Sequence, residues 1–266
     1  MAELPFVMIA TALAVVIALT LLWSLSVALK DASIIDIFWG PGFVLIAWVA
    51  FLFSDGVDAR KWLLATLATL WGLRLGVYLA LRNIGHGEDP RYVAMRKRAE
   101  ANGQSFARRS YTRVYLLQGV IMWIVSLPLQ LGQTYNTPSS LGLAAIIGTA
   151  LFAIGFLFEA VGDFQLSRFK TDPANKGQVM DRGLWRYTRH PNYFGNACLW
   201  WGIFVVSCEN LVGLWGLISP VLMTFLLLKV SGVSLLEQSL KDTKPAYRDY
   251  VQRTSAFFPR PPKQSV

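Results

Sequence analysis

Long apolar runs, separated by short polar stretches, dominate the pattern of the chain. Each run approaches the roughly 20 apolar residues that an α-helix needs to cross a bilayer. Only Asn210 separates the last two runs, which predicts a tight hairpin there. The pattern therefore indicates an all-α polytopic membrane protein, with residues 1–266 forming a single domain of seven transmembrane helices. The predicted spans cover residues 5–29, 33–53, 62–81, 114–131, 140–161, 193–209 and 211–230.

Composition supports a membrane protein. Hydrophobic residues make up 54% of the chain and charged residues 15%, whereas a soluble domain is typically about 25% charged. The first apolar run follows no basic residue, is too long for a signal peptide and lacks a small-residue cleavage site. We therefore expect this run to be a membrane span that is not cleaved off.

The distribution of lysine and arginine predicts the orientation in the membrane. Of the 25 basic residues, eight lie in residues 82–114, six in residues 163–192 and seven from Lys229 onward. The positive-inside rule places these three regions in the cytoplasm. With seven spans, the N-terminus is then outside and the C-terminus is cytoplasmic. Arg60 and Lys61 fall on the outer side as an exception to the rule.

A few ionisable residues lie within the predicted spans or at their ends: Asp36, Arg74, Glu159, Asp163, Lys229 and Glu237. A charged group inside a span costs about 3 kcal/mol on insertion scales and usually faces a cavity or a partner. All six fall in the predicted cytoplasmic half, which favours a polar cavity open to the cytoplasm. The alternative is a set of interhelical salt bridges and of arginines that reach the membrane surface. Helical spacing places Asp163 on one face with Glu159, Leu166 and Lys170.

Two polar stretches are rich in groups suited to a nucleotide. Residues 82–98 read RNIGHGEDPRYVAMRKR, and residues 181–196 read DRGLWRYTRHPNYFGN. Arginine offers bidentate donors to phosphate, aromatic rings offer stacking surfaces, and Gly85 and Gly87 permit close approach of the backbone. Because the chain lacks a Rossmann glycine turn and a P-loop, a nucleotide would have to lie in a pocket of a helical bundle.

The alternative for these stretches is that their charge only sets the topology. Nucleic acid is not an expected partner, because no nucleic-acid motif accompanies the net charge of +9. We expect no metal site either, since no spacing typical of metal ligands is present.

The second stretch and the apolar helix after it resemble the C-terminal signature of membrane steroid 5-alpha-reductases and sterol reductases. Three further segments are similar to the bacterial branch of this superfamily: SIIDIFWGPGFV (33–44), LWGLRLGVYLALRNIGHGEDPRY (70–92) and YRDYVQRTSAFFP (247–259). The resemblance implies a seven-helix enzyme of the bacterial inner membrane that binds NADPH from the cytoplasmic side. It also implies reduction of a carbon–carbon double bond conjugated to a ketone in a steroid-like lipid. Membrane lipids surround such an enzyme, and no obligate protein partner is implied.

The resemblance also implies which residues bind the cofactor. Asn192 matches an asparagine of the reductase signature, and Asp163 matches an upstream aspartate. Two positions depart from the reductase pattern, since Asn196 stands in place of an acidic residue and Glu237 in place of a tyrosine. The other expected cofactor-binding residues are Arg74, Arg82, Asn83, Leu166, Lys170, Arg182, Arg186, Tyr187, Arg189, His190, Tyr193 and Lys229.

The expected catalytic acid is Asp36, which aligns with a glutamate in the second span of the reductases. Hydride transfer to an enone leaves negative charge on the carbonyl oxygen, and a neutral carboxylic acid can stabilise that charge. The tyrosine that partners this acid in the reductases aligns with Trp71, whose indole can only donate N–H. Tyr78 and Tyr115 are the candidate substitutes. The alternative role for Asp36 is to balance the charge of Arg74.

Three other functional classes compete with a reductase. Methyltransferases that use S-adenosylmethionine to modify lipid or prenyl groups share the RHPNYFG loop, but they usually carry two consecutive glutamates where this chain has Glu237 and Gln238. A sterol-binding or transport protein would be expected to break its helices near the bilayer midplane in both halves, and only the PGF after Trp39 is such a break. A purely structural membrane subunit would leave the composition of the two polar stretches unexplained.

Overall fold

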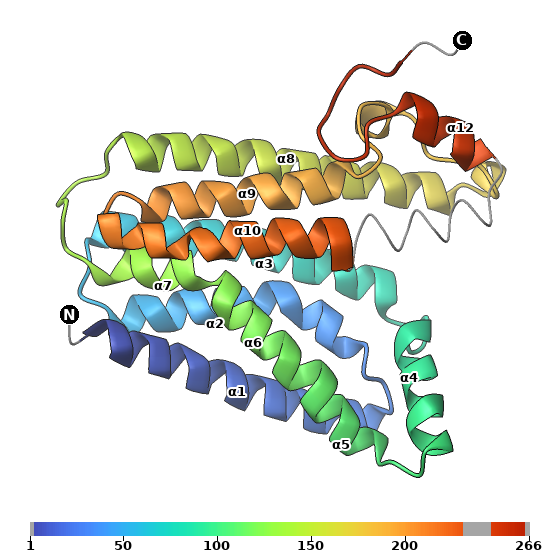
Figure 1. Cartoon of the computed structure of the whole chain (residues 1–266), viewed down its shortest axis with the longest axis horizontal. Helices are drawn as coiled ribbons and strands as arrows, with labels where there is room; N and C mark the ends of the chain where they lie inside the picture. Colours follow the sequence, from blue (N-terminus) through green and yellow to red (C-terminus); the bar gives the residue numbers. More distant parts are fainter. Residues whose placement is uncertain (1–2, 231–245, 264–266) are drawn as a thin grey trace. The chain divides into compact units, whose positions relative to one another are not determined.

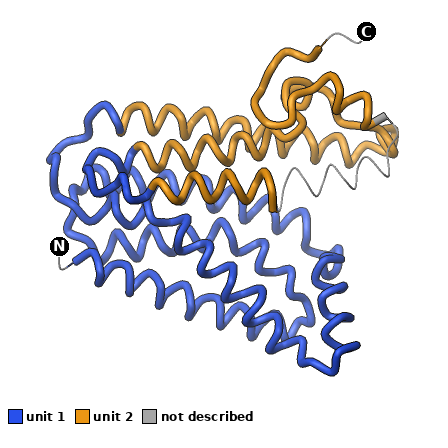
Figure 2. Tube along the Cα trace, viewed as in Figure 1, with its two compact units in different colours: residues 1–144, 206–216 blue, residues 145–205, 217–266 orange. Residues whose placement is uncertain are grey.

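The computed structural model describes residues 3–230 and 246–263, and this part of the chain forms helices and no strand. The chain divides into two compact units (Figure 2). Unit 1 comprises residues 1–144 and 206–216, and unit 2 comprises residues 145–205 and 217–266.

Unit 1 is built on three long helices, α1 (Glu3–Leu29), α2 (Ile34–Phe53) and α3 (Asp58–Asn83) (Figure 1). After α3, the shorter helix α4 (Pro90–Ala101) lies across the ends of these three helices (Figure 1). The chain then returns through a bent series of helical segments: α5 (Phe106–Ser110), a π-helical turn (Tyr111–Tyr115), α6 (Leu116–Val125) and α7 (Leu127–Thr134).

Helices α2 and α3 pack closely because glycines face each other at their crossing. A Cβ atom on Gly40 would overlap the backbone of Gly72, and a Cβ atom on Gly72 would overlap Gly40. One turn further along α3, Gly76 leaves room for the ring of Pro41. Small residues of this kind allow the backbones of membrane helices to approach one another, where dispersion contacts rather than the hydrophobic effect hold the helices together.

Two basic residues at the start of α3 bind backbone carbonyl groups of unit 1. Arg60 is fully buried and donates hydrogen bonds to the carbonyl oxygens of Gly132, at 2.7 Å, and of Tyr135. Lys61 is also buried and donates to the carbonyl oxygen of Ser54. These cations were expected as exceptions to the charge rule, and their carbonyl partners give them a structural role at the end of α7.

Unit 2 contains most of the two helices α8 (Leu143–Thr171) and α9 (Pro191–Ser207). Two short 3₁₀ turns, Pro173–Asn175 and Gly183–Arg186, interrupt the segment between them. The chain re-enters unit 2 at Leu217, the last residue of the 3₁₀ stretch Leu211–Leu217, and continues as α10 (Ile218–Phe225) and a π-helical turn (Leu226–Val230). The last described helix is α12 (Ala246–Arg253).

A regular row of glycines brings α8 and α9 into contact, and we call this contact the α8–α9 seam. Gly148, Gly155 and Gly162 recur every seven residues on α8, as Gly195 and Gly202 do on α9. A Cβ atom on Gly195 would overlap the backbone of Gly155 and of Glu159, and one on Gly202 would meet Gly148. A seven-residue repeat keeps one face of each helix against its neighbour, so side chains next to these glycines are held within the seam.

Several helices are long and apolar enough to cross a membrane. Among the described residues, five helices meet this description: Glu3–Leu29, Ile34–Phe53, Asp58–Asn83, Leu143–Thr171 and Leu211–Val230. A sixth candidate is the pair Phe106–Val125 and Leu127–Thr134, which is bent by 42°. The remaining predicted span corresponds to α9, which has only 17 residues. The multi-pass membrane class therefore agrees with the structure, while the number of seven spans and the orientation of the termini stay predictions.

Candidate functional site

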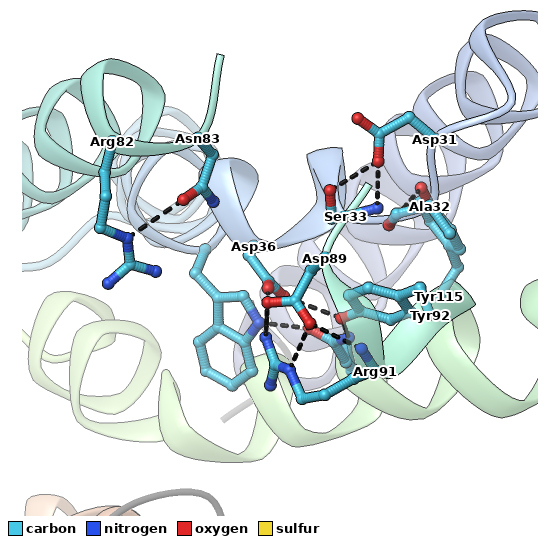
Figure 3. Close-up of polar contacts among 12 residues, drawn as sticks. Asp31, Ala32, Ser33, Asp36, Arg82, Asn83, Asp89, Arg91, Tyr92 and Tyr115 are labelled. Carbon is cyan, nitrogen blue, oxygen red and sulfur yellow. Dashed lines mark hydrogen bonds and ion pairs between the residues drawn. The ribbon is translucent and has the colours of Figure 1, made fainter. Parts of the chain in front are cut away.

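The most connected polar site in unit 1 centres on Asp36 in the first turn of α2 (Figure 3). Asp36 accepts hydrogen bonds at 2.8 Å from the hydroxyl of Tyr92 and at 2.8 Å from the guanidinium of Arg91. Arg91 also binds the carboxylate of Asp89, at 2.9 Å. The Tyr92 hydroxyl in turn accepts from the amide of Gln118, at 3.4 Å. We refer to these five residues as the Asp36 cluster.

Local sequence explains how residues 85–92 reach Asp36. Gly85 and Gly87 have φ angles of 85° and 78°, a left-handed conformation that glycine adopts without strain. These glycines therefore shape the turn after α3, and nothing lies within 4 Å of where a Cβ atom would be placed on either. Asp89 then caps α4 by accepting from the backbone N–H of Arg91, and proline occupies the first helical position.

A second set of polar contacts connects the segment before and within α4 to the turn between α1 and α2. The carboxylate of Glu88 accepts from the backbone N–H of Ala32, at 2.8 Å, and forms a salt bridge with Arg96, also at 2.8 Å. Arg96 donates in addition to the carbonyl oxygen of Lys30, at 3.1 Å. These contacts fix the start of α4 against the start of α2, so Tyr92 and Arg91 are held in place beside Asp36.

The protonation of the cluster follows from its contacts. The hydrogen bonds from Arg91 hold the pKa of Asp89 below its ordinary value despite partial burial. Burial, together with the charge of Asp36, raises the pKa of the Tyr92 phenol. Tyr92 is therefore a neutral O–H donor at physiological pH, and Asp36 lies between that donor and a guanidinium.

Two of the predicted cations of α3, Arg74 and Arg82, lie beside the ring of Tyr78. The guanidinium groups of Arg74 and Arg82 lie 5.3 and 5.8 Å from the centre of the Tyr78 ring. Arg82 also donates to the side chain of Asn83, at 3.1 Å (Figure 3). Trp71 is buried and its ring packs 5.4 Å from that of Phe43.

In the structure, the carboxylate of Asp36 forms an ion pair with Arg91. Tyr115, the second candidate substitute for the tyrosine that accompanies the acid in the reductases, donates to the carbonyl oxygen of Ala32, at 3.3 Å. The hydroxyl of Tyr92 binds the carboxylate of Asp36.

In unit 2, two carboxylate–amide pairs lie in the α8–α9 seam. Asn192 donates to Asp163 at 3.0 Å, and Asn196 donates to Glu159 at 3.2 Å. Glu159 and Asp163 are 3% exposed and Asn196 is 9% exposed. The spacing of four on both helices brings the pairs together one helical turn apart. The expected face of α8 continues outward from them, because Leu166 is half-buried and Lys170 is exposed.

The signature stretch before α9 is held by hydrogen bonds to the rest of unit 2. The indole of the buried Trp185 donates to the carbonyl oxygen of Gly162, at 3.0 Å. Arg189 is buried and donates to the carbonyl oxygens of Val251, at 3.1 Å, and Thr254. Trp185 and Arg189 therefore connect the signature to α8 and to α12, and their side chains serve structural contacts.

The other predicted residues of unit 2 differ in exposure. His190 is buried and its ring stacks on Tyr193, with ring centres 5.3 Å apart. Exposed side chains belong to Arg182, Arg186, Tyr187 and Lys229. Arg182 and Arg186 line a cavity of about 510 Å³. Glu237 lies outside the described residues.

Comparison with known proteins assigns the chain to a family. The model of the family described as "Protein of unknown function (DUF1295)" matches residues 22–254. The chain belongs to the DUF1295 family. A relative in fission yeast, Schizosaccharomyces pombe, named "Uncharacterized protein C594.04c", is 25% identical over 272 residues, which cover 90% of this chain and 76% of the relative. No solved structure matches the chain. The DUF1295 match includes both the Asp36 cluster and the α8–α9 seam.

Sequence reasoning on this DUF1295 chain missed four members of the Asp36 cluster. Asp89, Arg91 and Tyr92 lie more than 50 residues from Asp36, and Gln118 lies in a different helix again. One signal was available, since an aspartate followed by proline is a common start of a helix. That signal predicts where α4 begins, but not which helix end its first turn contacts.

Proposed function

We propose that this protein is an NADPH-dependent reductase of a carbon–carbon double bond conjugated to a ketone, with a steroid-like lipid as substrate. The observation that carries the proposal is the hydrogen bond from the hydroxyl of the buried Tyr92 to the half-buried carboxylate of Asp36. Tyr92 supplies what the reaction needs from a protein, which is an O–H donor for a carbonyl oxygen that becomes negatively charged. The resemblance of the signature stretch to sterol reductases supports the same activity.

The residues of the α8–α9 seam fit the chemistry of the cofactor. Within the described chain, the buried side-chain oxygen of Asn196 accepts no hydrogen bond. An unsatisfied buried acceptor is costly, and a primary carboxamide such as that of nicotinamide carries N–H groups that can satisfy it. Asn192 and Asn196, oriented by Asp163 and Glu159, would hold this end of NADPH, which supplies the hydride when bound.

The Asp36 cluster determines which group donates to the substrate. Arg91 binds Asp36 as an ionised carboxylate, and an ionised carboxylate can only accept. We therefore assign donation to the neutral Tyr92 hydroxyl, which can rotate toward a substrate oxygen while it accepts from Gln118. Asp36 then has a positioning role beside the donor. In this scheme water supplies the proton of the α-carbon.

The proposal is tested by measuring NADPH oxidation by the purified full-length protein with a 3-oxo-Δ4 steroid such as progesterone. Replacing Tyr92 by phenylalanine removes the donor, so kcat should fall about 10²- to 10³-fold, as when one donor to an oxyanion is lost. The affinity for NADPH should stay the same. Asp36→Asn should lower kcat as well, because the amide no longer carries the charge that Arg91 balances.

Tyr111→Phe is the matched control. Tyr111 lies in the same unit and its hydroxyl hydrogen-bonds to Thr20, at 3.0 Å, outside the Asp36 cluster. This variant should keep the wild-type kcat. If Tyr92→Phe and Tyr111→Phe turn over the enone equally well, the Asp36 cluster is not the donor site.

A further inference from the structure

Unit 2 contains a cavity of about 510 Å³ whose lining is strongly basic. Its volume lies within the range of small-molecule sites. Four cationic side chains line it, and they come from the signature stretch (Arg182 and Arg186) and from the C-terminal segment (Arg253 and Lys263). Asp181 is the one carboxylate among the lining residues, so the local formal charge is +3.

Three of these cations have no side-chain partner within the described residues. Asp181 forms its ion pair with Arg253. Within the described chain, no hydrogen bond or ion pair involves the side chains of Arg182, Arg186 and Lys263. Like charges that gather around one hollow repel each other, and an anion with several oxygens relieves that repulsion. Arginine forks in particular match the geometry of phosphate oxygens.

The walls of the cavity are fixed by backbone contacts. The backbone N–H of Leu184 donates to the side chain of Gln165, at 3.0 Å, and the backbone N–H of Lys263 donates to the carbonyl oxygen of Arg253, at 2.9 Å. The hydroxyl of the buried Tyr250 donates to the carbonyl oxygen of Trp185. Because both lining segments are tied down, their backbones keep the four cations around the cavity, and little backbone ordering is required when an anion binds.

We propose that this cavity binds a phosphate monoester or diphosphate group. The inference stands on the cavity alone and does not depend on the reductase activity. Two sources can present this chemistry, namely the phosphates of a soluble nucleotide and the phosphomonoester headgroup of a membrane lipid.

The experiment measures binding to the full-length protein and to three variants. The probes are inorganic pyrophosphate, NADPH, NADH, and phosphatidylcholine vesicles with or without phosphatidic acid. Arg186→Gln and Lys263→Gln each remove one unpaired cation from the cavity. Arg248→Gln is the control, because Arg248 is an exposed cation on α12 that does not line the cavity. Melting temperatures without ligand show that each variant is folded.

Pyrophosphate should bind the wild type and the control alike, and should bind each cavity variant about tenfold more weakly, as expected for the loss of one charge-assisted hydrogen bond. A matching loss for NADPH but not for NADH identifies the nucleotide 2′-phosphate as the source. A matching loss only for vesicles with phosphatidic acid identifies the lipid headgroup. The inference is overturned if the cavity variants bind pyrophosphate as the wild type does, or if Arg248→Gln weakens binding equally.

The outcome also separates this inference from the proposed function. If both cavity variants bind NADPH with full affinity and the protein does not bind pyrophosphate, the phosphate-site inference is refuted and the proposed reductase function is unaffected. If the protein binds pyrophosphate in a way that depends on the cavity residues but does not bind NADPH, the phosphate-site inference is supported and the proposed reductase function is refuted.

Discussion

The α8–α9 seam and the Asp36 cluster are both polar sites that border close helix contacts, and the chain builds them in different ways. In the seam, two carboxylates and two amides repeat at a spacing of four, so the glycine repeat that packs the helices also brings the pairs together. In the Asp36 cluster, the Asp36 carboxylate meets Arg91 and Tyr92 from the start of α4, and Gln118 of α6 donates to the Tyr92 hydroxyl. The seam therefore depends on helix packing, whereas the cluster depends on a turn and a helix cap.

The largest loss of stability is expected from a substitution in the α8–α9 seam, because the same residues pack the helices and form the candidate site. In Gly195→Leu, the new side chain overlaps the backbone of α8 at Gly155 and Glu159. Overpacking typically costs about 1–3 kcal/mol, and backbone atoms cannot move aside as a side chain can, so the loss should reach or exceed the upper end of that range. Thermal unfolding in detergent measures it. Ala153→Leu is the control, since Ala153 is exposed on α8, and it should melt as the wild type does.

A smaller effect is expected when the pairing in the seam is broken without changing its shape. Asn192→Asp removes the amide donor and sets a second carboxylate against Asp163, which should cost about 2 kcal/mol, the range of a buried group left without its partner. Adding Asp163→Asn exchanges the two groups and should restore much of the stability. A double variant no more stable than Asn192→Asp would show that the pair does not act as a unit.

The smallest change in stability is expected at Asp89, the residue of the Asp36 cluster that caps α4. The pKa of Asp89 is lowered in the folded protein, so ionised Asp89 contributes to the free energy of unfolding. This contribution is complete above the ordinary aspartate pKa of about 3.9 and is lost as the pH falls through the lowered pKa. The pair is partly exposed, so we expect less than about 1 kcal/mol. Between about pH 5 and pH 2, the wild type should lose more stability than Asp89→Asn, which keeps a good cap. Parallel melting curves across that interval would contradict this.

The regular parts of the molecule could be predicted from the sequence. Apolar length predicts α1, α2 and α3 closely, and helical spacing places Glu159 and Asp163 together on a buried face. The predicted span ends at residue 161, and α8 continues to Thr171, in agreement with the helical face predicted for Asp163, Leu166 and Lys170. Apolarity marks the end of a membrane span, but helix propensity carries the chain further.

The irregular parts could not be predicted in the same way. The sequence indicated that Gly85 and Gly87 permit close approach of the backbone to a ligand, but it did not show that their positive φ angles shape the turn that brings residues 88–92 to Asp36. Arg189 suggested a phosphate contact, yet it is buried against carbonyl groups of α12 and the segment after it. Composition shows that donors are present, but only the fold decides whether a donor is used by the backbone or left for a ligand.

Binding of NADPH to the purified protein tests the central claim most directly. A ligand at 100 times its Kd stabilises by about 2.7 kcal/mol, so NADPH should raise the melting temperature of the wild type and of Asp36→Asn. It should raise that of Asn192→Ala much less, and S-adenosylmethionine should have no effect on any of them. Stabilisation by S-adenosylmethionine instead of NADPH, or an equal response to NADPH in Asn192→Ala, would contradict the assignment of the seam to a nicotinamide nucleotide.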